Sequence, residues 1–188
     1  MSAQQELLPE PADATAAGPQ FKDLHPAVRV IAAGSVTAAA VALAVLFALM
    51  LAEAAARYLF ASPLGWNVSL VERVLMPGAV FLALPWMYAC AGHVSAGLVY
   101  SRLPSSVQTA ARVVTLIAVL GSAIVLLVAG VNGAASAFAL GDAPPPGSSD
   151  IGLPTWVWLS LQPVGALGLL AVALIDAPRF LRSGEVES

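Results

Sequence analysis

Residues 113–141 read "VVTLIAVLGSAIVLLVAGVNGAASAFALG" and contain no Asp, Glu, Lys or Arg. About 18 or more consecutive apolar residues are long enough to cross the hydrocarbon core of a bilayer as a helix. This stretch therefore predicts a membrane-spanning helix, and the rest of the chain can be searched for others of its kind.

The composition agrees with a membrane protein. Hydrophobic residues make up 59% of the chain and charged residues 10%, whereas soluble domains have roughly 45–50% apolar residues. The mean hydropathy is +0.85. Three further charge-free runs extend from Val30 to Ala52, from Val74 to Gly92 and from Ile151 to Ile175. The runs are continuous and lack the alternation of barrel strands, so we predict an all-α integral membrane protein with four transmembrane helices.

The polar ends of the chain flank this membrane domain. Residues 1–29 are rich in Ala and Pro and have no apolar segment that could form a core, which predicts a disordered cytoplasmic tail. No apolar run follows a basic segment near Met1, so we do not expect a cleavable signal peptide. The predicted organisation is a tail at 1–29, a four-helix membrane domain at 30–182 and a C-terminal tail at 183–188.

The orientation follows from the basic residues, which are retained on the cytoplasmic side. With four spans, the two termini and the middle loop share one side, and only Arg57 and Arg73 lie on the other. Both termini are therefore expected in the cytoplasm. The residues on the inner side are Lys22, Arg29, Arg102, Arg112, Arg179 and Arg182.

The inner loop between the second and third spans, Ser95 to Arg112, is neither apolar enough to span the membrane nor plainly unstructured. Leu98, Val99 and Leu103 could form an apolar face, and Pro104 follows them. This pattern predicts a short helix lying along the membrane surface, with a plain loop as the alternative.

Four charged residues lie at the first outer hairpin: Glu53, Arg57, Glu72 and Arg73. Charges inside a membrane are costly and are functional candidates. Glu53 and Arg57 have the i, i+4 spacing of a helical ion pair, whereas adjacent Glu72 and Arg73 point to different faces. We predict a Glu53–Arg57–Glu72 cluster that fixes the hairpin and leaves Arg73 for lipid headgroups or a partner. The alternative is that these charges are exposed to lipid headgroups and contribute little to stability.

Other features of the second span concern its shape and its ends. Pro77 and Pro85 each remove an amide donor, and we interpret them as static bends. Trp66 at the outer entrance is placed at the membrane interface, as are Trp156 and Trp158 at the start of the fourth span. His93 lies at the inner end of the second span, where interface anchoring is its expected role.

The sequence does not contain the residues that membrane enzymes or carriers need. Its histidines are His25 in the tail and His93, and its one cysteine is Cys90. No facing pair of membrane histidines could hold a haem, and no cofactor is expected. The third and fourth spans have uncharged centres and no internal repeat, so a self-sufficient carrier is disfavoured. Small residues in "GVNGAASAFALG" and in the Ala-rich first span indicate close helix packing, as in a subunit of a larger assembly.

From the first span to Arg182, the chain resembles the small membrane subunit of tripartite ATP-independent periplasmic (TRAP) transporters, the DctQ-like family. The resemblance rests on the order and spacing of "RYLFASPLGW", "LVERVLMPGAVFLALPW", "GHVSAGLVYSRLP" and "PTWVWLSLQPVG". Arg57, Trp66 and Glu72 match the outer hairpin, and His93 matches the inner end of the second span. Ser69 and Gly97 stand where many relatives have acids, and Ser95 stands where they often have a basic residue.

The resemblance implies a scaffold role without a substrate site. Such subunits pair with a large permease subunit that carries the substrate and sodium sites, and a periplasmic binding protein delivers the solute. It implies the bacterial inner membrane, cation-coupled symport of an organic anion, and no cofactor on this subunit. Glu72 would brace the hairpin, and Arg73 would be available to the binding protein. The alternative is a four-helix accessory or assembly subunit of another membrane complex.

Overall fold

The structure, a computed structural model, describes residues 24–62, 64–91, 104–143 and 152–182. Within these ranges every regular element is helical. Four helices are long and apolar enough to cross a membrane, at Pro26–Phe60, Asn67–Cys90, Val107–Leu140 and Thr155–Pro178. The predicted all-α class with four spans is confirmed.

The first hairpin consists of α1 (Pro26–Phe60) and a second span built from three consecutive pieces. These pieces are α2 (Asn67–Leu70), the π-helical segment η2 (Val71–Leu75) and α3 (Met76–Ala91). Pro26 begins α1, where a missing N–H costs nothing, and Nδ1 of His25 accepts a hydrogen bond from the Ala27 amide at 3.2 Å. At the other end, Ala61 adopts a left-handed conformation with φ 52° and stops the helix.

The second hairpin consists of α5 (Ser105–Leu140), α6 (Thr155–Leu159) and α7 (Leu161–Arg182). Gly141 ends α5 with φ 62°, a conformation in which a side chain would be strained. The amide of Thr155 donates a hydrogen bond to the Asp142 carbonyl at 3.0 Å. This bond joins the two ends of the outer loop.

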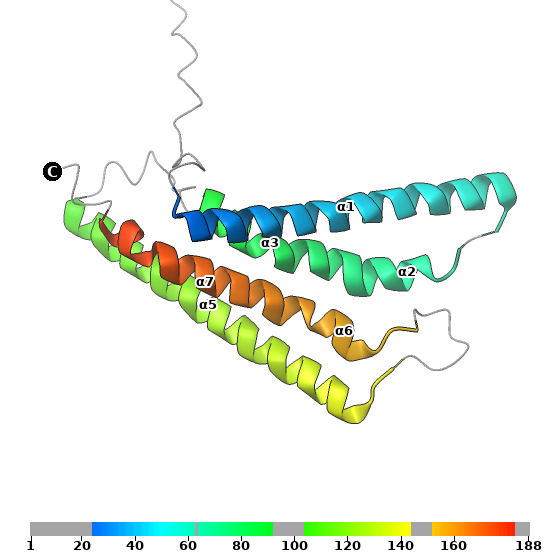
Figure 1. Ribbon diagram of the computed structural model, residues 1–188. Coiled ribbons are helices and arrows are strands. Elements are labelled where there is room, and N and C mark those ends of the chain that lie inside the picture. The colour runs from blue at the N-terminus through cyan, green and yellow to red at the C-terminus, as the bar shows by residue number, and fades with distance from the viewer. Residues whose placement is uncertain (1–23, 63, 92–103, 144–151, 183–188) are drawn as a thin grey trace, which may run out of the picture.

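The helices form a row in the order α1, α3, α7, α5 (Figure 1). α1 packs on α3, α3 on α7 and α7 on α5, so the two long helices α1 and α5 form the edges. They contain 35 and 36 residues, and at about 1.5 Å per residue each is over 50 Å long. The hydrocarbon core is about 30 Å thick, so both must tilt or extend beyond it. The beginning of α1 and the end of α7 lie at one end of the row (Figure 1).

The helices extend beyond the charge-free runs from which they were predicted. α1 includes Arg29, Glu53 and Arg57, and the residues from Pro26 to Arg29, assigned to the tail from the sequence, are helical. Charged residues are compatible with a helix that continues into the interface. The ends are set instead by Pro26 and by the left-handed residue Ala61.

Some sequence predictions fall on other parts of the chain. Residues 95–103 of the predicted surface helix lie outside the described residues, while Ser105–Arg112 are the first turns of α5. The tails at 1–23 and 183–188 also lie outside them. The surface helix and the tails therefore stay predictions.

The end of the row at which α1 begins, called the inner end after the orientation predicted from the sequence, contains a small apolar core where α1, α3 and α7 meet. Val28, Ala32, Ala89 and Val172 are buried there, with Tyr88 packed against them. Small side chains dominate this core, so the helix backbones approach closely.

Candidate functional site

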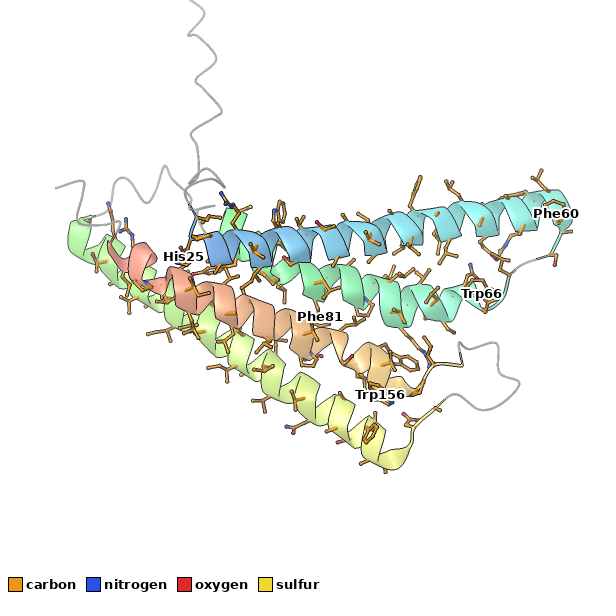
Figure 2. The ribbon with its side chains drawn as sticks, in the orientation of Figure 1. His25, Phe60, Trp66, Phe81 and Trp156 are labelled. Atoms are coloured by element: carbon orange, nitrogen blue, oxygen red, sulfur yellow. The ribbon has the colours of Figure 1, made fainter. Side chains whose placement is uncertain are left out.

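The backbones of α3 and α7 approach each other closely at Gly165. A Cβ atom added to Gly165 would lie 2.1 Å from the carbonyl oxygen of Phe81 and 2.6 Å from its carbonyl carbon. Figure 2 shows Phe81 at this junction. Pro85, four residues after Phe81, has no N–H to donate to that carbonyl. The Cα hydrogen of Gly165 points to the oxygen instead, which is the arrangement of a weak Cα–H···O contact.

The same two helices meet again one turn further along. A Cβ atom at Gly168 would lie 2.7 Å from Cγ of Pro85, so this glycine forms a notch for the proline ring. Gly78 faces Leu161 more loosely, with 3.5 Å between an added Cβ and the leucine Cδ1. Pro85 therefore has two effects: it removes a donor from α3, and its ring fits into α7. The sequence predicted a static bend at Pro85, and this packing is compatible with a rigid element.

A second close contact joins α5 to α7. A Cβ atom at Gly130 would lie 2.6 Å from Cδ of Pro163. Beside it, Nε2 of Gln162 donates a hydrogen bond to the carbonyl of Leu126 at 3.1 Å. In a hydrocarbon environment, such a bond between helices helps to fix their register.

The first outer hairpin contains an ion pair at the spacing that the sequence indicated. Nη2 of Arg57 lies 3.0 Å from Oε1 of Glu53. The other carboxylate oxygen, Oε2, accepts a hydrogen bond from the backbone amide of Leu64 at 2.9 Å. Glu53 thus connects α1 to the loop that follows it, which is the bracing role expected of the predicted cluster.

Glu72 does not join this cluster. Arg57 is paired with Glu53, and the Glu72 side chain is exposed in η2. Arg73 makes a contact that the sequence did not indicate, because its guanidinium carbon lies 5.5 Å from the ring centroid of Trp158. This cation–π contact connects the two hairpins at their outer ends. A sequence cannot show it, because it depends on which helices become neighbours.

Aromatic residues surround this outer end. Trp66 is 45% exposed on the first hairpin, while Trp156 of α6 packs edge-on against Phe138 of α5 with centroids 5.8 Å apart. Trp158 is buried, at 9% exposed. Of the tryptophans expected at the interface, Trp66 and Trp156 are exposed and Trp158 belongs to the hairpin contact.

In the described part of the chain, two residues have buried polar side-chain atoms without a hydrogen-bond partner. Asn67, at the start of α2, is 1% exposed, and neither its amide nitrogen nor its oxygen is bonded. The Tyr88 hydroxyl at the inner end is in the same condition. Buried polar groups without a partner cost stability.

The remaining candidates give no reactive centre in the described part of the chain. His93 lies outside the described residues, His25 caps α1, and Cys90 is an exposed free thiol. Among the described residues, no group of three or more His, Cys, Asp or Glu side chains could hold a metal ion. The arrangement can therefore pack helices and hold loops, and the described residues contain no set suited to catalysis.

Sequence reasoning missed Gly165, Gly168 and Gln162, which set the spacing of α7 from its neighbours, whereas Gly130 begins the stretch "GVNGAASAFALG" for which close packing was predicted. The signal was present, since "QPVGALG" places two glycines three residues apart just after a proline, and small residues at helical spacing favour close packing in membranes. The sequence does not show which helix packs against each of these glycines.

Comparison with known protein families gives a match to most of the chain. The family model described as "Tripartite ATP-independent periplasmic transporters, DctQ component" matches residues 46–182. Searches of the curated proteins and of the solved structures found no match. The matched range begins in α1 and ends at the last residue of α7, so it includes both hairpins.

Proposed function

Because this chain belongs to the DctQ component family of TRAP transporters, we propose that it is the small scaffold subunit of such a transporter. In this role it supports a large permease subunit during cation-coupled uptake of an organic anion, and a periplasmic binding protein delivers the solute. The family is a transporter component and not an enzyme family. The family match over residues 46–182 is the observation that carries the proposal.

The packing of the helices supports a fixed element. Gly165 and Gly168 bring α7 into close contact with α3, and Gly130 with Gln162 joins α7 to α5. Closely packed interfaces cannot deform continuously without losing contacts. A row of helices joined in this way is suited to hold a moving partner in place.

The absence of charge in the centre of the spans fits the same role. The described charges of the first hairpin, Glu53, Arg57, Glu72 and Arg73, lie at its outer end, and Arg29 lies at the opposite end of α1. Substrate and ion sites of secondary transporters are found near the midplane. We therefore assign the anion and sodium sites to the large subunit, with no cofactor on this chain.

The orientation belongs to the same proposal. Basic residues near the ends of α1, α5 and α7 favour the cytoplasm for both termini, and the bacterial inner membrane is the membrane concerned. The outer end of the row, with the Glu53–Arg57 pair, then faces the periplasm. Glu72, exposed at that end, is in position to meet the binding protein.

The test is uptake by proteoliposomes that contain the large permease subunit, with and without this chain, supplied with the binding protein. We expect uptake driven by a sodium gradient only when both membrane subunits are present. Equal uptake without this chain would contradict the scaffold role. Copurification with an unrelated complex instead would favour the accessory-subunit alternative.

A further inference from the structure

The inner and outer parts of the second span are held in different ways. Along α3, the Phe81 backbone lies against Gly165 and the Pro85 ring fits the notch at Gly168, so this part is fixed to α7. Residues 67–73, which are α2 and the first half of η2, lie beyond these contacts. We call residues 67–73 the outer segment.

The turn between the outer segment and α3 lacks two α-helical hydrogen bonds. The amide of Met76 donates to the Val71 carbonyl, five residues back, instead of to the Glu72 carbonyl. The next residue, Pro77, has no N–H to donate to the Arg73 carbonyl. A π turn and a proline are each a known cause of helix bending, and here they are adjacent. We therefore expect this turn to bend more easily than the helix α3 that follows it.

The other end of the outer segment follows a second flexible point. Gly65 has φ 75°, a conformation that glycine adopts without strain, and a Cβ added there would meet nothing within 4 Å beyond its chain neighbours. The loop before it is held, because the Leu64 amide donates a hydrogen bond to Glu53. The outer segment thus lies between two places at which the backbone can rotate.

The position of the outer segment is stabilised by some of its side chains and disfavoured by another. Val71 is buried, at 3% exposed, and the guanidinium carbon of Arg73 lies 5.5 Å from the ring centroid of Trp158. Asn67 has the opposite effect: it is 1% exposed, and its side-chain nitrogen and oxygen have no hydrogen-bond partner among the described residues. A buried amide without partners carries the full cost of its desolvation. Outward movement of the segment would let water reach Asn67 but would break the Arg73 contact.

We propose that the outer segment is a hinged flap with a closed and an open position. The closed position is the one in the structure, with Arg73 over Trp158 and the Asn67 amide buried. In the open position the segment turns about Gly65 and the turn before Pro77, the cation–π contact is broken and water hydrates Asn67. The α3–α7 contact does not change. The flap therefore lets the outer end of the chain change shape while the helix row stays fixed.

The test is a distance measurement between two spin labels by electron paramagnetic resonance, on the full chain in lipid nanodiscs with Cys90→Ser. One label is placed at Val68 of the outer segment and the other at Val131 of α5, which are 51% and 50% exposed. We expect two distances for this pair, one for each position of the flap. In the matched control the first label is at Val80 of α3, which is 60% exposed, and a single distance to Val131 is expected.

Two variants should shift the balance in opposite directions. Arg73→Ala removes the contact with Trp158 and should raise the ratio of open to closed flap about two- to fivefold, as expected for the loss of one cation–π contact. Asn67→Leu replaces the unpaired amide by an apolar side chain of similar size and should lower this ratio. Glu72→Ala, at an exposed position beside Arg73, is the control variant and should leave the ratio unchanged.

Two results would overturn the flap. One is a single distance for the Val68 pair that neither Arg73→Ala nor Asn67→Leu alters. The other is two distances for the Val80 pair as well, which would place the movement in the whole span and not in its outer segment. The measurement needs no partner subunit, so either result concerns this chain alone and leaves the assignment to a transporter in place.

Discussion

The α3–α7 contact and the outer hairpin differ in how easily each is recognised in the sequence and in how strongly each constrains the helices. The hairpin contains the conspicuous charges, Glu53, Arg57, Glu72 and Arg73, and among them Glu53 connects α1 to the following loop. The α3–α7 contact consists of inconspicuous glycines, and at Gly165 it leaves no room for even a methyl group. In this chain, close backbone approach determines how the helices pack, and the Glu53 carboxylate holds the local turn after α1.

The largest effect is expected for Gly165→Ala. The added methyl group would lie against the Phe81 backbone, which cannot move as a flexible side chain can. We expect destabilisation of about 3 kcal/mol or more, measured as a lower midpoint of denaturation in detergent. Gly121→Ala is the control, because nothing lies within 4 Å of its added Cβ. Equal midpoints for the two variants would show that α3 and α7 are not in close contact.

Gly168→Ala and Gly130→Ala should come next. In each case the added methyl group meets a proline ring, at 2.7 Å and 2.6 Å respectively, and the ring or the helix has to shift. We expect a loss of about 1–3 kcal/mol for each, by the same denaturation measurement. Gly78→Ala, whose methyl group would make an ordinary contact with Leu161, should be nearly neutral. A loss at Gly78 equal to that at Gly168 would contradict the ordering.

These glycines also show how far the sequence could predict the structure. Charge-free runs predicted four spans, because the thickness of the bilayer fixes the length of a helix. The i, i+4 spacing indicated the neighbours Glu53 and Arg57, because that contact is local. The partners of Gly165 and of Arg73 lie on other helices, and nothing local in the sequence specifies them.

Gln162→Leu should have a smaller effect. It removes the hydrogen bond from Nε2 to the Leu126 carbonyl while keeping a side chain of similar size. Hydrogen bonds between membrane helices average about 0.6 kcal/mol and reach about 1.7 kcal/mol, so a decrease in that range is expected in the denaturation midpoint. Asn132→Leu, which replaces an exposed amide of α5 that has no hydrogen-bond partner among the described residues, is the control and should not lower the midpoint of the isolated chain. A similar decrease there would remove the special role of Gln162.

The smallest effect is expected at the outer end of the row. Arg73→Ala removes the cation–π contact with Trp158, which is worth about 0.5–1 kcal/mol at exposed sites. We also expect a shift in the fluorescence of Trp158, measured in a variant whose other tryptophans are replaced by Phe. Glu72→Ala, one residue away and exposed, should leave that fluorescence unchanged. A shift of the same size in Glu72→Ala would contradict the specific contact.

The most direct test of the scaffold role is to lock the row and then measure transport. Gly78→Cys and Leu161→Cys, in a Cys90→Ser background, place two thiols at the α3–α7 contact, where a short crosslinker can join them. If the row is a fixed scaffold, crosslinked proteoliposomes with the large subunit and the binding protein should transport at the rate of the uncrosslinked ones. Loss of uptake on crosslinking, restored when the crosslink is cleaved, would show that α3 and α7 move against each other during transport.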